Sequence, residues 1–360
     1  MLKPFDEVFE DRTKYGTKIK TDDYHSSGAH IIIDQGQEQI AGYTNLEEGL
    51  FTEVPAIIFG DHTRIIKYVD RPFFLGADGV KVLRCRYKDA NYKYLYYALK
   101  SVRVPNTGYN RHFKWLKEAT ISYPDINVQE KIVEALEKAS GIMDKRRQQL
   151  SALDNLIKAR FVEMFGDINI NSKNWPIQPL GDLCTIVRGG SPRPIEQFLG
   201  GDIPWIKIGD ATEGESIYLT STKEHIIQDG VKKSRLVKAG SLIFANCGVS
   251  LGFARIITFD GCIHDGWLAM EDIDERLDKV FLLQSLNQMT EHFREMAPAG
   301  TQPNLNTAIM KAYQQIIPPI ALQKEFITFM EQIDKSKSVI QKSLDETQLL
   351  FDGLMQEYFG

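Results

Sequence analysis

The stretch Val128–Phe165 reads VQEKIVEALEKASGIMDKRRQQLSALDNLIKARFVEMF, and the interpretation of the whole chain starts from it. Alternating steps of four and three residues connect mostly apolar positions, namely Ile132, Leu136, Ala139, Met143, Arg146, Leu150, Leu153, Ile157, Arg160 and Met164. This narrow stripe is typical of a coiled-coil seam rather than of a helix packed on a broad core. Because a residue before proline avoids the α-helical region, the helix should begin after Pro124, near Asn127.

A second copy of this stretch lies 194 residues further along the chain. Tyr109–Gly166 aligns with Pro303–Gly360 without a gap, and Pro124 falls on Pro318. The matching seam consists of Phe326, Met330, Ile333, Lys337, Ile340, Leu344, Thr347, Phe351, Leu354 and Tyr358. A repeat with a period of about half the chain indicates two similar halves, each a globular domain followed by a long helix.

Each seam covers about 36 residues, or roughly 50 Å of helix, which is too long to be buried against one small domain. One alternative is that each helix docks only on its own domain. The favoured interpretation is that the two helices pair as an antiparallel coiled coil. Arg146, Arg160 and Lys337 would be costly if they were buried in this seam. We therefore expect them to extend outward or to fix the register.

The remaining sequence predicts an α+β protein with an internal pseudo-twofold repeat. Short β-branched runs bounded by Gly, Asp and Pro predict strands at Ala29–Asp34, Pro55–Gly60, Thr63–Val69, Pro204–Ile208, Ser241–Ala245 and Phe253–Thr258. Shorter helices are expected over Tyr92–Ser101 and Lys279–Met296. The predicted division is a first domain at 1–120, a central helix at 121–166, a linker at 167–179, a second domain at 180–312 and a final helix at 313–360.

Composition limits the class of protein. The 360 residues are 43% hydrophobic and 25% charged, as in soluble globular proteins, and no run of eighteen apolar residues predicts a membrane span. The first residues lack the apolar core of a signal peptide. Four scattered cysteines show no C-x-x-C spacing, so neither a zinc site nor a disulfide framework is expected, and the reducing cytoplasm is the expected location. The net charge of −5 argues mildly against a free-standing nucleic-acid binder.

No catalytic constellation is evident in the sequence. A phosphate-binding G-x-x-x-x-G-K-[ST] loop, a G-x-G-x-x-G turn after a strand, an [ND]-P-P-[YF] tetrapeptide and an H-E-x-x-H pair are all missing. His264–Asp265 resembles an acid–base pair, but Asp78 occupies the equivalent place without a preceding histidine. A turn aspartate is the favoured interpretation, and the sequence predicts neither a metal site nor an enzyme acting alone.

The duplicated layout resembles the specificity (S) subunit of type I restriction–modification systems. Four stretches carry the resemblance: PLGDL at Pro179–Leu183, IPWIKIGD at Ile203–Asp210, GTQPNL at Gly300–Leu305 and IPPIALQ at Ile317–Gln323. The junction from Met164 to Trp175 is equally typical. The resemblance spans the whole chain, but it is weaker over residues 1–110, where YNRH at 109–112 replaces QPNL.

This resemblance implies two target-recognition domains, each reading one half of a split double-stranded DNA target, with the helix pair setting their spacing. It also implies two modification subunits that bind S-adenosylmethionine and methylate adenine, and restriction subunits that translocate and cut DNA. The cofactor would then belong to the partner and not to this chain. The alternatives are a coiled-coil adaptor with two ligand-binding domains, and an enzyme with an unrecognised site.

Candidate DNA-contacting residues are basic or polar and lie on loops at strand ends. In the first domain they are Arg12, Lys14, Lys18, His62, Arg64, Arg111 and His112. In the second domain they are Arg188, Ser191, Arg193, Lys207, Asp210, Asn246, Ser250, Thr301, Gln302 and Asn304. Arginine suits phosphates or a guanine edge, and Gln or Asn suits adenine. An ordinary solvated loop for 188–193 and a buried-turn role for Asn304 remain open alternatives.

Overall fold

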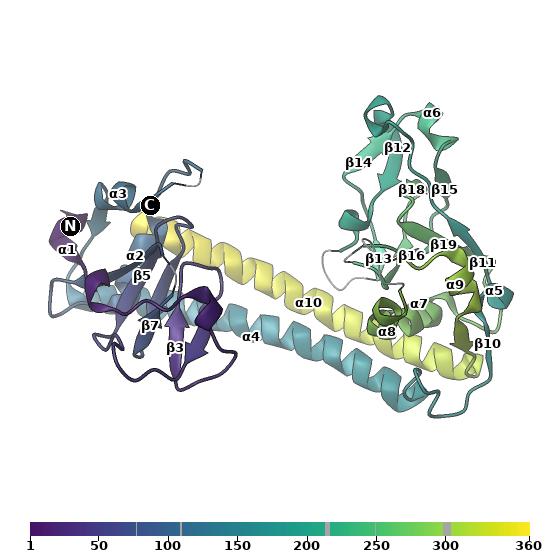
Figure 1. Cartoon of the computed structure of the whole chain (residues 1–360), viewed down its shortest axis with the longest axis horizontal. Helices are drawn as coiled ribbons and strands as arrows, with labels where there is room; N and C mark the ends of the chain where they lie inside the picture. The colour runs from purple at the N-terminus through teal and green to yellow at the C-terminus, as the bar shows by residue number, and fades with distance from the viewer. Residues whose placement is uncertain (77, 109, 213–216, 249, 298–303) are drawn as a thin grey trace. The chain divides into compact units, whose positions relative to one another are not determined.

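The computed structural model describes all residues except 77, 109, 213–216, 249 and 298–303, and it divides into two compact units (Figure 1). The first unit comprises Met1–Arg147 and Lys342–Gly360, and the second comprises Gln148–Gln341. The two long helices, α4 (Ile126–Phe165) and α10 (Ile320–Phe359), each contribute one part to both units. The α+β class and the long helices predicted from the sequence are confirmed.

The first unit is built on a four-stranded antiparallel sheet of order β2-β8-β5-β6 and a three-stranded sheet of order β4-β3-β7. A short pair, β1-β9, joins the beginning of the domain to the segment that precedes α4. The strands are β1 (Leu2–Pro4), β2 (Phe9–Asp11), β3 (His30–Ile33), β4 (Gly42–Thr44), β5 (Ala56–Gly60), β6 (Ile66–Val69), β7 (Phe73–Leu75), β8 (Val80–Cys85) and β9 (Thr120–Ser122). The shorter helices are α1 (Phe5–Val8), α2 (Tyr92–Ser101) and α3 (Phe113–Lys117), with 3₁₀ turns at Thr13–Tyr15 and Thr21–Asp23.

The second unit repeats this plan with two additional strands. Its sheets have the orders β11-β19-β16-β17-β13 and β14-β12-β18-β15, and β10 pairs with β20. The strands are β10 (Ile177–Pro179), β11 (Thr185–Arg188), β12 (Leu199–Ile206), β13 (Tyr218–Leu219), β14 (Glu224–Ile226), β15 (Arg235–Val237), β16 (Leu242–Ala245), β17 (Ala254–Ile257), β18 (Gly261–Ile263), β19 (Trp267–Glu271) and β20 (Gln314–Ile316). The helices are α5 (Leu180–Leu183), α6 (Gln228–Val231), α7 (Lys279–Gln288), α8 (Thr290–Met296) and α9 (Thr307–Ala312), with 3₁₀ turns at Ile195–Gln197 and Ile208–Asp210.

The strand pairings show the repeat more clearly than the sequence does. The order β2-β8-β5-β6 corresponds to β11-β19-β16-β17, and β4-β3-β7 corresponds to β14-β12-β18. In both three-stranded sets, the middle strand pairs antiparallel to one neighbour and parallel to the other. Strands β13 and β15 have no counterpart among the described residues of the first unit. The fold is therefore duplicated even in the globular parts, where no single shift aligns the two halves of the sequence.

Both long helices complete the core of each unit. In the first unit, Leu136 of α4 joins a cluster with Tyr94 and Leu95 of α2, and Phe351 and Leu354 of α10 pack against it. In the second unit, one cluster contains Phe161 and Phe165 of α4, Phe281 of α7, and Phe326 and Met330 of α10. Aromatic rings make up much of this second cluster, and the centroids of Phe161 and Phe326 are 5.4 Å apart. The seams are thus part of the domain cores.

The predicted seam positions are buried or partly buried along both helices. Ile132, Leu136, Met143, Ile157 and Met330 are buried, while Leu150, Ile333, Ile340, Leu344 and Leu354 are partly buried. In the second unit, ion pairs connect the helices at the charged seam positions, Lys337 to Asp154 and Arg160 to Glu325 (3.0 Å). The order of these pairs is antiparallel, and they fix the register as expected. Arg146, in the first unit, is partly buried.

Several local expectations are corrected by the structure. Lys279–Met296 forms two helices instead of one, because Met289 leaves the helical conformation between them. The strand predicted from Thr63 begins only at Ile66, because Arg64 adopts a positive φ of 62° in the preceding turn. The strand predicted to reach Ile208 ends at Ile206, and the segment predicted as a linker contains β10. The predicted strands are thus shortened at turns, and only the linker is more ordered than expected, because β10 pairs with β20.

No helix in the described part of the chain is both long enough and apolar enough to cross a membrane. The same residues contain no group of three or more His, Cys, Asp or Glu side chains arranged to hold a metal ion.

Replacing Lys337 by methionine should destabilise the second unit by about 1–2 kcal/mol, between the values for exposed and buried ion pairs. The change leaves Asp154, which is 20% exposed, without its cation. Burial already raises the pKa of the Asp334 carboxyl, and the change also removes the Lys337 charge that opposes this rise. Hydrogen exchange of α10 in the second unit reports the loss locally.

The double variant Asp154→Leu/Lys337→Met should recover most of this stability, because it removes both charges together. Lys342→Met is the matched control, since its ion pair with Glu346 is exposed and long at 3.9 Å, and should change stability by less than about 0.5 kcal/mol. If Lys337→Met and Lys342→Met behaved alike, the register-fixing role of Lys337 would be wrong.

Candidate nucleic-acid interface

Equivalent loops meet at one edge of each domain. In the first unit they follow β3, β5 and β7, and in the second unit they follow β12, β16 and β18. Strands β3 and β7 are parallel, as are β12 and β18, so the loops after them leave the sheet at the same edge. Most of the residues predicted to contact DNA lie on these loops or beside them.

Gln35 connects the three loops of the first unit. Its side-chain oxygen accepts a hydrogen bond from the backbone N–H of His62 (3.1 Å), and its Nε2 donates to the carbonyl of Asp78 (2.8 Å). The connection requires glycine at position 79, where φ is +94° and a Cβ atom would stand 2.7 Å from Gln35 and 2.8 Å from His62. The sequence analysis missed Gln35, although its place two residues beyond β3 is a signal that could have identified it.

Three of the predicted residues of the first unit, Lys18, His62 and Arg111, act on Asp78 here. Lys18 donates to the Asp78 carboxylate (2.7 Å), and this contact is the main cause of the lowered pKa of Asp78. Arg111 and His62 lower the same pKa further through their charges. Arg64 donates to the carbonyl of Val104 (3.3 Å), on the loop that leads to Arg111. We call Lys18, His62, Arg64, Asp78 and Arg111 the first basic surface.

The second unit has a corresponding arrangement around Asp265. The Ser191 hydroxyl donates to the Asp265 carboxylate (2.7 Å), and Arg193 approaches the other carboxylate oxygen at 3.8 Å. Arg188 donates its Nε to the Asp265 carbonyl (3.0 Å). Burial alone would raise the pKa of Asp265, but the Ser191 hydrogen bond and the neighbouring positive charges lower it. We call Arg188, Ser191, Arg193, His264 and Asp265 the second basic surface.

His264 has a defined tautomer in this surface. Its Nδ1 accepts a hydrogen bond from the backbone N–H of Gly266 (2.9 Å), so the ring proton of the neutral form resides on Nε2, 2.9 Å from the Asp265 carboxylate. Burial lowers the pKa of His264, with the charge of Asp265 opposing it. These contacts hold the turn between β18 and β19, which agrees with the turn-aspartate interpretation.

Several predicted contacts are occupied by other residues of the chain. Arg12 donates to both carboxylate oxygens of Glu53 and lies over the Tyr15 ring, 4.0 Å from its centroid. Lys14 also lies near that ring, at 4.8 Å. Lys207 forms an ion pair with Glu224. Arg12 and Lys207 can therefore reach DNA only by exchanging their carboxylate partners, whereas Lys14 is exposed.

Asp210 has a structural role in the fold, and its predicted DNA contact stays a prediction. One carboxylate oxygen accepts from the backbone N–H of Lys207 (2.8 Å) and from the Thr222 hydroxyl (2.8 Å), and the other accepts from the N–H of Lys223 (3.2 Å). The carboxylate thus caps the turn after β12. Its negative charge would also repel phosphate.

The predictions for His112 and Asn246 are corrected, because both side chains are fully buried. The N–H of His112 donates to the carbonyl of Asp61 (2.7 Å), and the Asp61 carboxylate accepts from Phe113 N–H (2.7 Å), which caps α3. In the second unit, Leu305 N–H donates to the carbonyl of Asn246 (2.8 Å). The same backbone tie therefore holds the loop before α3 onto the end of β5 in the first unit, and the loop before α9 onto the end of β16 in the second. We call β5 and β16 the central strands.

Asn304 belongs to this tie and not to an exposed recognition loop. It forms an isolated bridge with Cys247, and its Oδ1 accepts from Asn246 Nδ2 (3.4 Å). The buried-turn alternative is therefore favoured for Asn304. Thr301 and Gln302 fall outside the described residues.

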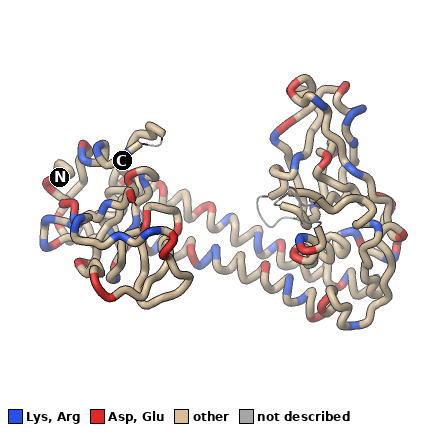
Figure 2. The backbone as a smooth tube through the Cα atoms, in the orientation of Figure 1, with Lys and Arg blue, Asp and Glu red and all other residues tan. Residues whose placement is uncertain are grey.

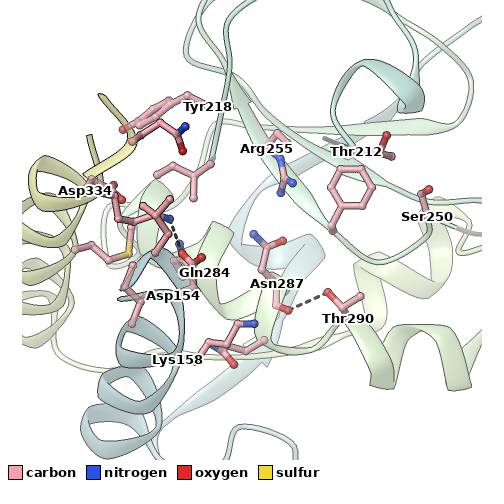
Figure 3. A pocket seen from close by; sticks show the side chains of 18 of the residues that line it. Asp154, Lys158, Thr212, Tyr218, Ser250, Arg255, Gln284, Asn287, Thr290 and Asp334 are labelled. Atoms are coloured by element: carbon pink, nitrogen blue, oxygen red, sulfur yellow. Dashed lines mark hydrogen bonds and ion pairs between the residues drawn. The ribbon is translucent and has the colours of Figure 1, made fainter. Parts of the chain in front are cut away.

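Ser250 lines a cavity of about 980 Å³ between the second domain and the parts of α4 and α10 in the same unit (Figure 3). Figure 3 shows Arg255, Gln284 and Asn287 on the domain side, with Asp154 and Asp334 on the helices. The lining carries charges of both signs, because Lys158 and Lys337 stand on the helices beside the two carboxylates and Arg255 faces them from the domain. No single sign of charge marks this cavity as a DNA-binding surface, and the predicted contact of Ser250 stays a prediction.

Charge is mixed over the whole chain, in keeping with the net charge of −5 (Figure 2). Figure 2 shows Asp and Glu interspersed with Lys and Arg in both units. Non-specific attraction to DNA should thus be small, and local groupings matter more than the total charge.

Sequence comparison identifies the family. The model of the type I restriction modification DNA specificity domain matches residues 3–152 and 172–347. The chain belongs to this family. It is 28% identical over 253 residues to the specificity subunit of a type I restriction enzyme of Escherichia coli, a match that covers 65% of this chain and 60% of that relative. The match thus spans less than two thirds of the length of the relative.

Two solved structures share the fold of this family member. The S subunit of a type I restriction-modification system from M. genitalium has a TM-score of 0.58 at 17% identity, covering 100% of this chain and 96% of that one. A second chain, from work on complex assembly and conformational transition of the type I system, has a TM-score of 0.60 at 14% identity, covering 100% and 97%. At these identities the likeness concerns the fold alone.

His264, in the second basic surface, should make the stability of the second unit depend on pH. Because its folded-state pKa lies below the ordinary value of about 6.5, the stability that it contributes is present above that value and is lost as the pH falls. Urea unfolding at pH 7.5 and 5.5 should therefore show a smaller acid-induced loss for His264→Asn, whose side-chain oxygen can still accept from Gly266. His225→Asn on β14 should keep the wild-type loss, and an unchanged loss in His264→Asn would contradict the assignment.

Proposed function

We propose that this chain is the DNA-specificity subunit of a type I restriction–modification enzyme, with each domain reading one half of a two-part target. One observation carries the proposal. The two halves of a duplicated fold bring basic and polar side chains to the same edge, around Asp78 in one unit and Asp265 in the other. Different residues at equivalent places are what two readers of unlike half-sites require.

The spacing of the two half-sites depends on the long helices. Each has 40 residues, or roughly 60 Å of helix, and each belongs to both units. Half-sites read on one face of DNA recur every ~34–36 Å. A helix pair whose register is fixed by ion pairs is a suitable element for setting such a distance.

Catalysis is assigned to partner subunits in this proposal. Two modification subunits would bind S-adenosylmethionine and methylate adenine, and restriction subunits would translocate and cut. The E. coli relative is itself named as a subunit of a restriction enzyme, which supports assembly with other chains. The mixed surface charge supports the same arrangement, because a partner that also holds the duplex supplies affinity that this chain lacks.

The proposal is tested by selecting duplexes from a random pool with the chain alone and with its modification subunit. The expected result is one two-part sequence enriched by the assembled complex and methylation that depends on the partner. Enrichment of no sequence in either case would favour the adaptor alternative. Methylation by the isolated chain with labelled S-adenosylmethionine would overturn the non-catalytic assignment.

The spacer can be tested by its length. A heptad inserted after Arg147 in α4 and another after Gln341 in α10 add about 10 Å to both helices, so the selected target should gain about three base pairs between its halves. The matched control carries the insertion in α4 alone, which mismatches the helices and should weaken binding to every spacing. An unchanged spacer with the double insertion would contradict the role of the helices.

The modularity of the reader can be tested by exchange. Replacing residues 180–300 by the corresponding domain of another family member should change one half of the selected target and leave the other half intact. Methylation mapping of a host that carries the hybrid and its modification subunit reads out both halves at once. A change in both halves would show that the domains do not read independently.

A further inference from the structure

In each unit, one turn aspartate occupies the position where the basic side chains converge. Asp78 accepts from Lys18 at 2.7 Å, and the positive charges of Arg111 and His62 act on it. Asp265 accepts from Ser191 at 2.7 Å, with Arg193 at 3.8 Å and His264 at 2.9 Å. Each basic surface therefore contains the anion that its own cations face in the absence of DNA.

The two aspartates are equivalent in the fold. Each directly precedes a glycine whose carbonyl accepts from the residue after the central strand, Gly79 from Asp61 N–H (2.6 Å) and Gly266 from Asn246 N–H (2.9 Å). The side chains that surround them are not equivalent, since lysine supplies the closest contact in one unit and serine in the other. The aspartate is thus common to both surfaces while its partners differ.

The backbone carbonyl of Asp265 orients the guanidinium group of Arg188 but occupies only one of its donors. Arg188 is held through Nε by the Asp265 carbonyl (3.0 Å), and its two Nη groups form no hydrogen bond or ion pair within the described part of the chain. A guanidinium held through Nε keeps its remaining donors available, and such a pair of donors suits a phosphate or a guanine edge. Arg193, which is 81% exposed, lies beyond it on the same loop.

We propose that Asp78 and Asp265 are positioning residues that hold the basic side chains of each surface in the free protein and give them up to acceptor oxygens of DNA when the target binds. The inference rests on the proposed function and deepens it, because it names the groups that set selectivity. A phosphate that is not correctly placed has to compete with the carboxylate for the basic side chain. Only a duplex that offers acceptors in the correct positions compensates for the lost ion pairs.

Two single substitutions test the idea in the complex assembled with the modification subunit. Asp78→Asn and Asp265→Asn keep the size of the side chain and remove its charge. Binding is measured against three probes: the duplex selected from the random pool, and two versions with one half scrambled. Each variant should bind the duplex with its own half scrambled about 2- to 5-fold more tightly than wild type does, the range expected when one exposed ion pair is lost.

The same variants should discriminate less well at one half of the target only. For Asp265→Asn the preference for the correct second half should fall by about 2- to 5-fold, with the first half unaffected, and the converse holds for Asp78→Asn. The salt dependence of binding separates the two kinds of acceptor. If the released cations bind phosphates, the slope of log K against log salt concentration should steepen by up to about 0.9 on the scrambled probes. If they bind base edges, that slope should not change on the scrambled probes, and only the affinity for the intact half should change. Asp265→Glu, which retains the charge, should keep the wild-type slope.

Matched controls lie at the other ends of the same strands. Asp260→Asn removes a turn aspartate that pairs with Lys238 (2.7 Å) before β18, and Asp70→Asn removes an exposed aspartate before β7. Both should leave affinity and discrimination within twofold of wild type. Thermal unfolding of all variants checks that the fold is retained.

The inference is overturned if Asp78→Asn and Asp265→Asn match their controls, or if they weaken binding to all probes equally, which would mean that the carboxylates contact DNA or only brace the turn. These outcomes are distinct from failure of the proposed function. In that case the wild-type complex would select no sequence at all.

Discussion

The apolar stripes of the two long helices are the constraint on which the structure depends. A 40-residue helix with a narrow seam cannot shield that seam by itself, and neither globular domain closes its core without help. In the first unit the seam supplies Leu136 and Phe351, and in the second it supplies Phe161 and Phe326. Domain and helices therefore share one core in each unit, so a change in the helices is also a change in the domains.

Duplication is preserved where backbone groups must pair and is lost where side chains are free to vary. The tie from the central strand to the loop before α3 or α9 uses backbone N–H and carbonyl groups, so aspartate at 61 and asparagine at 246 serve equally well. The glycines at 79 and 266 recur because a Cβ atom would collide with neighbouring side chains at either place. The surfaces above them share a position and a turn aspartate but not their basic residues. Stability and recognition are thus assigned to different atoms of the same loops.

The long helices and central strands could be predicted because their signals are local. Proline before the helix and a seven-residue period place α4 within two residues of its observed start, and β-branched runs locate β5 and β16. The break at Met289 carries no proline or glycine, so the sequence gives no warning of it. Contacts between side chains on loops far apart in the sequence could not be predicted either. Glu53 lies 41 residues from Arg12, and only the folded chain brings its carboxylate to that guanidinium.

The same limit applies to the candidate interface, and it explains why basic residues alone were an incomplete guide. Lys18, Arg111 and Arg193 were identified by type, but their availability depends on carboxylates that the fold places beside them. A specific DNA-binding protein competes against a vast excess of non-target sequence, so tight attraction to any phosphate reduces its effective selectivity. An acidic chain whose cations are already paired avoids that loss, since the free energy gained from one correct phosphate or base edge must exceed that of an internal contact. The net charge of −5 is therefore consistent with a reader of DNA, and the pairing of its cations is the physical reason.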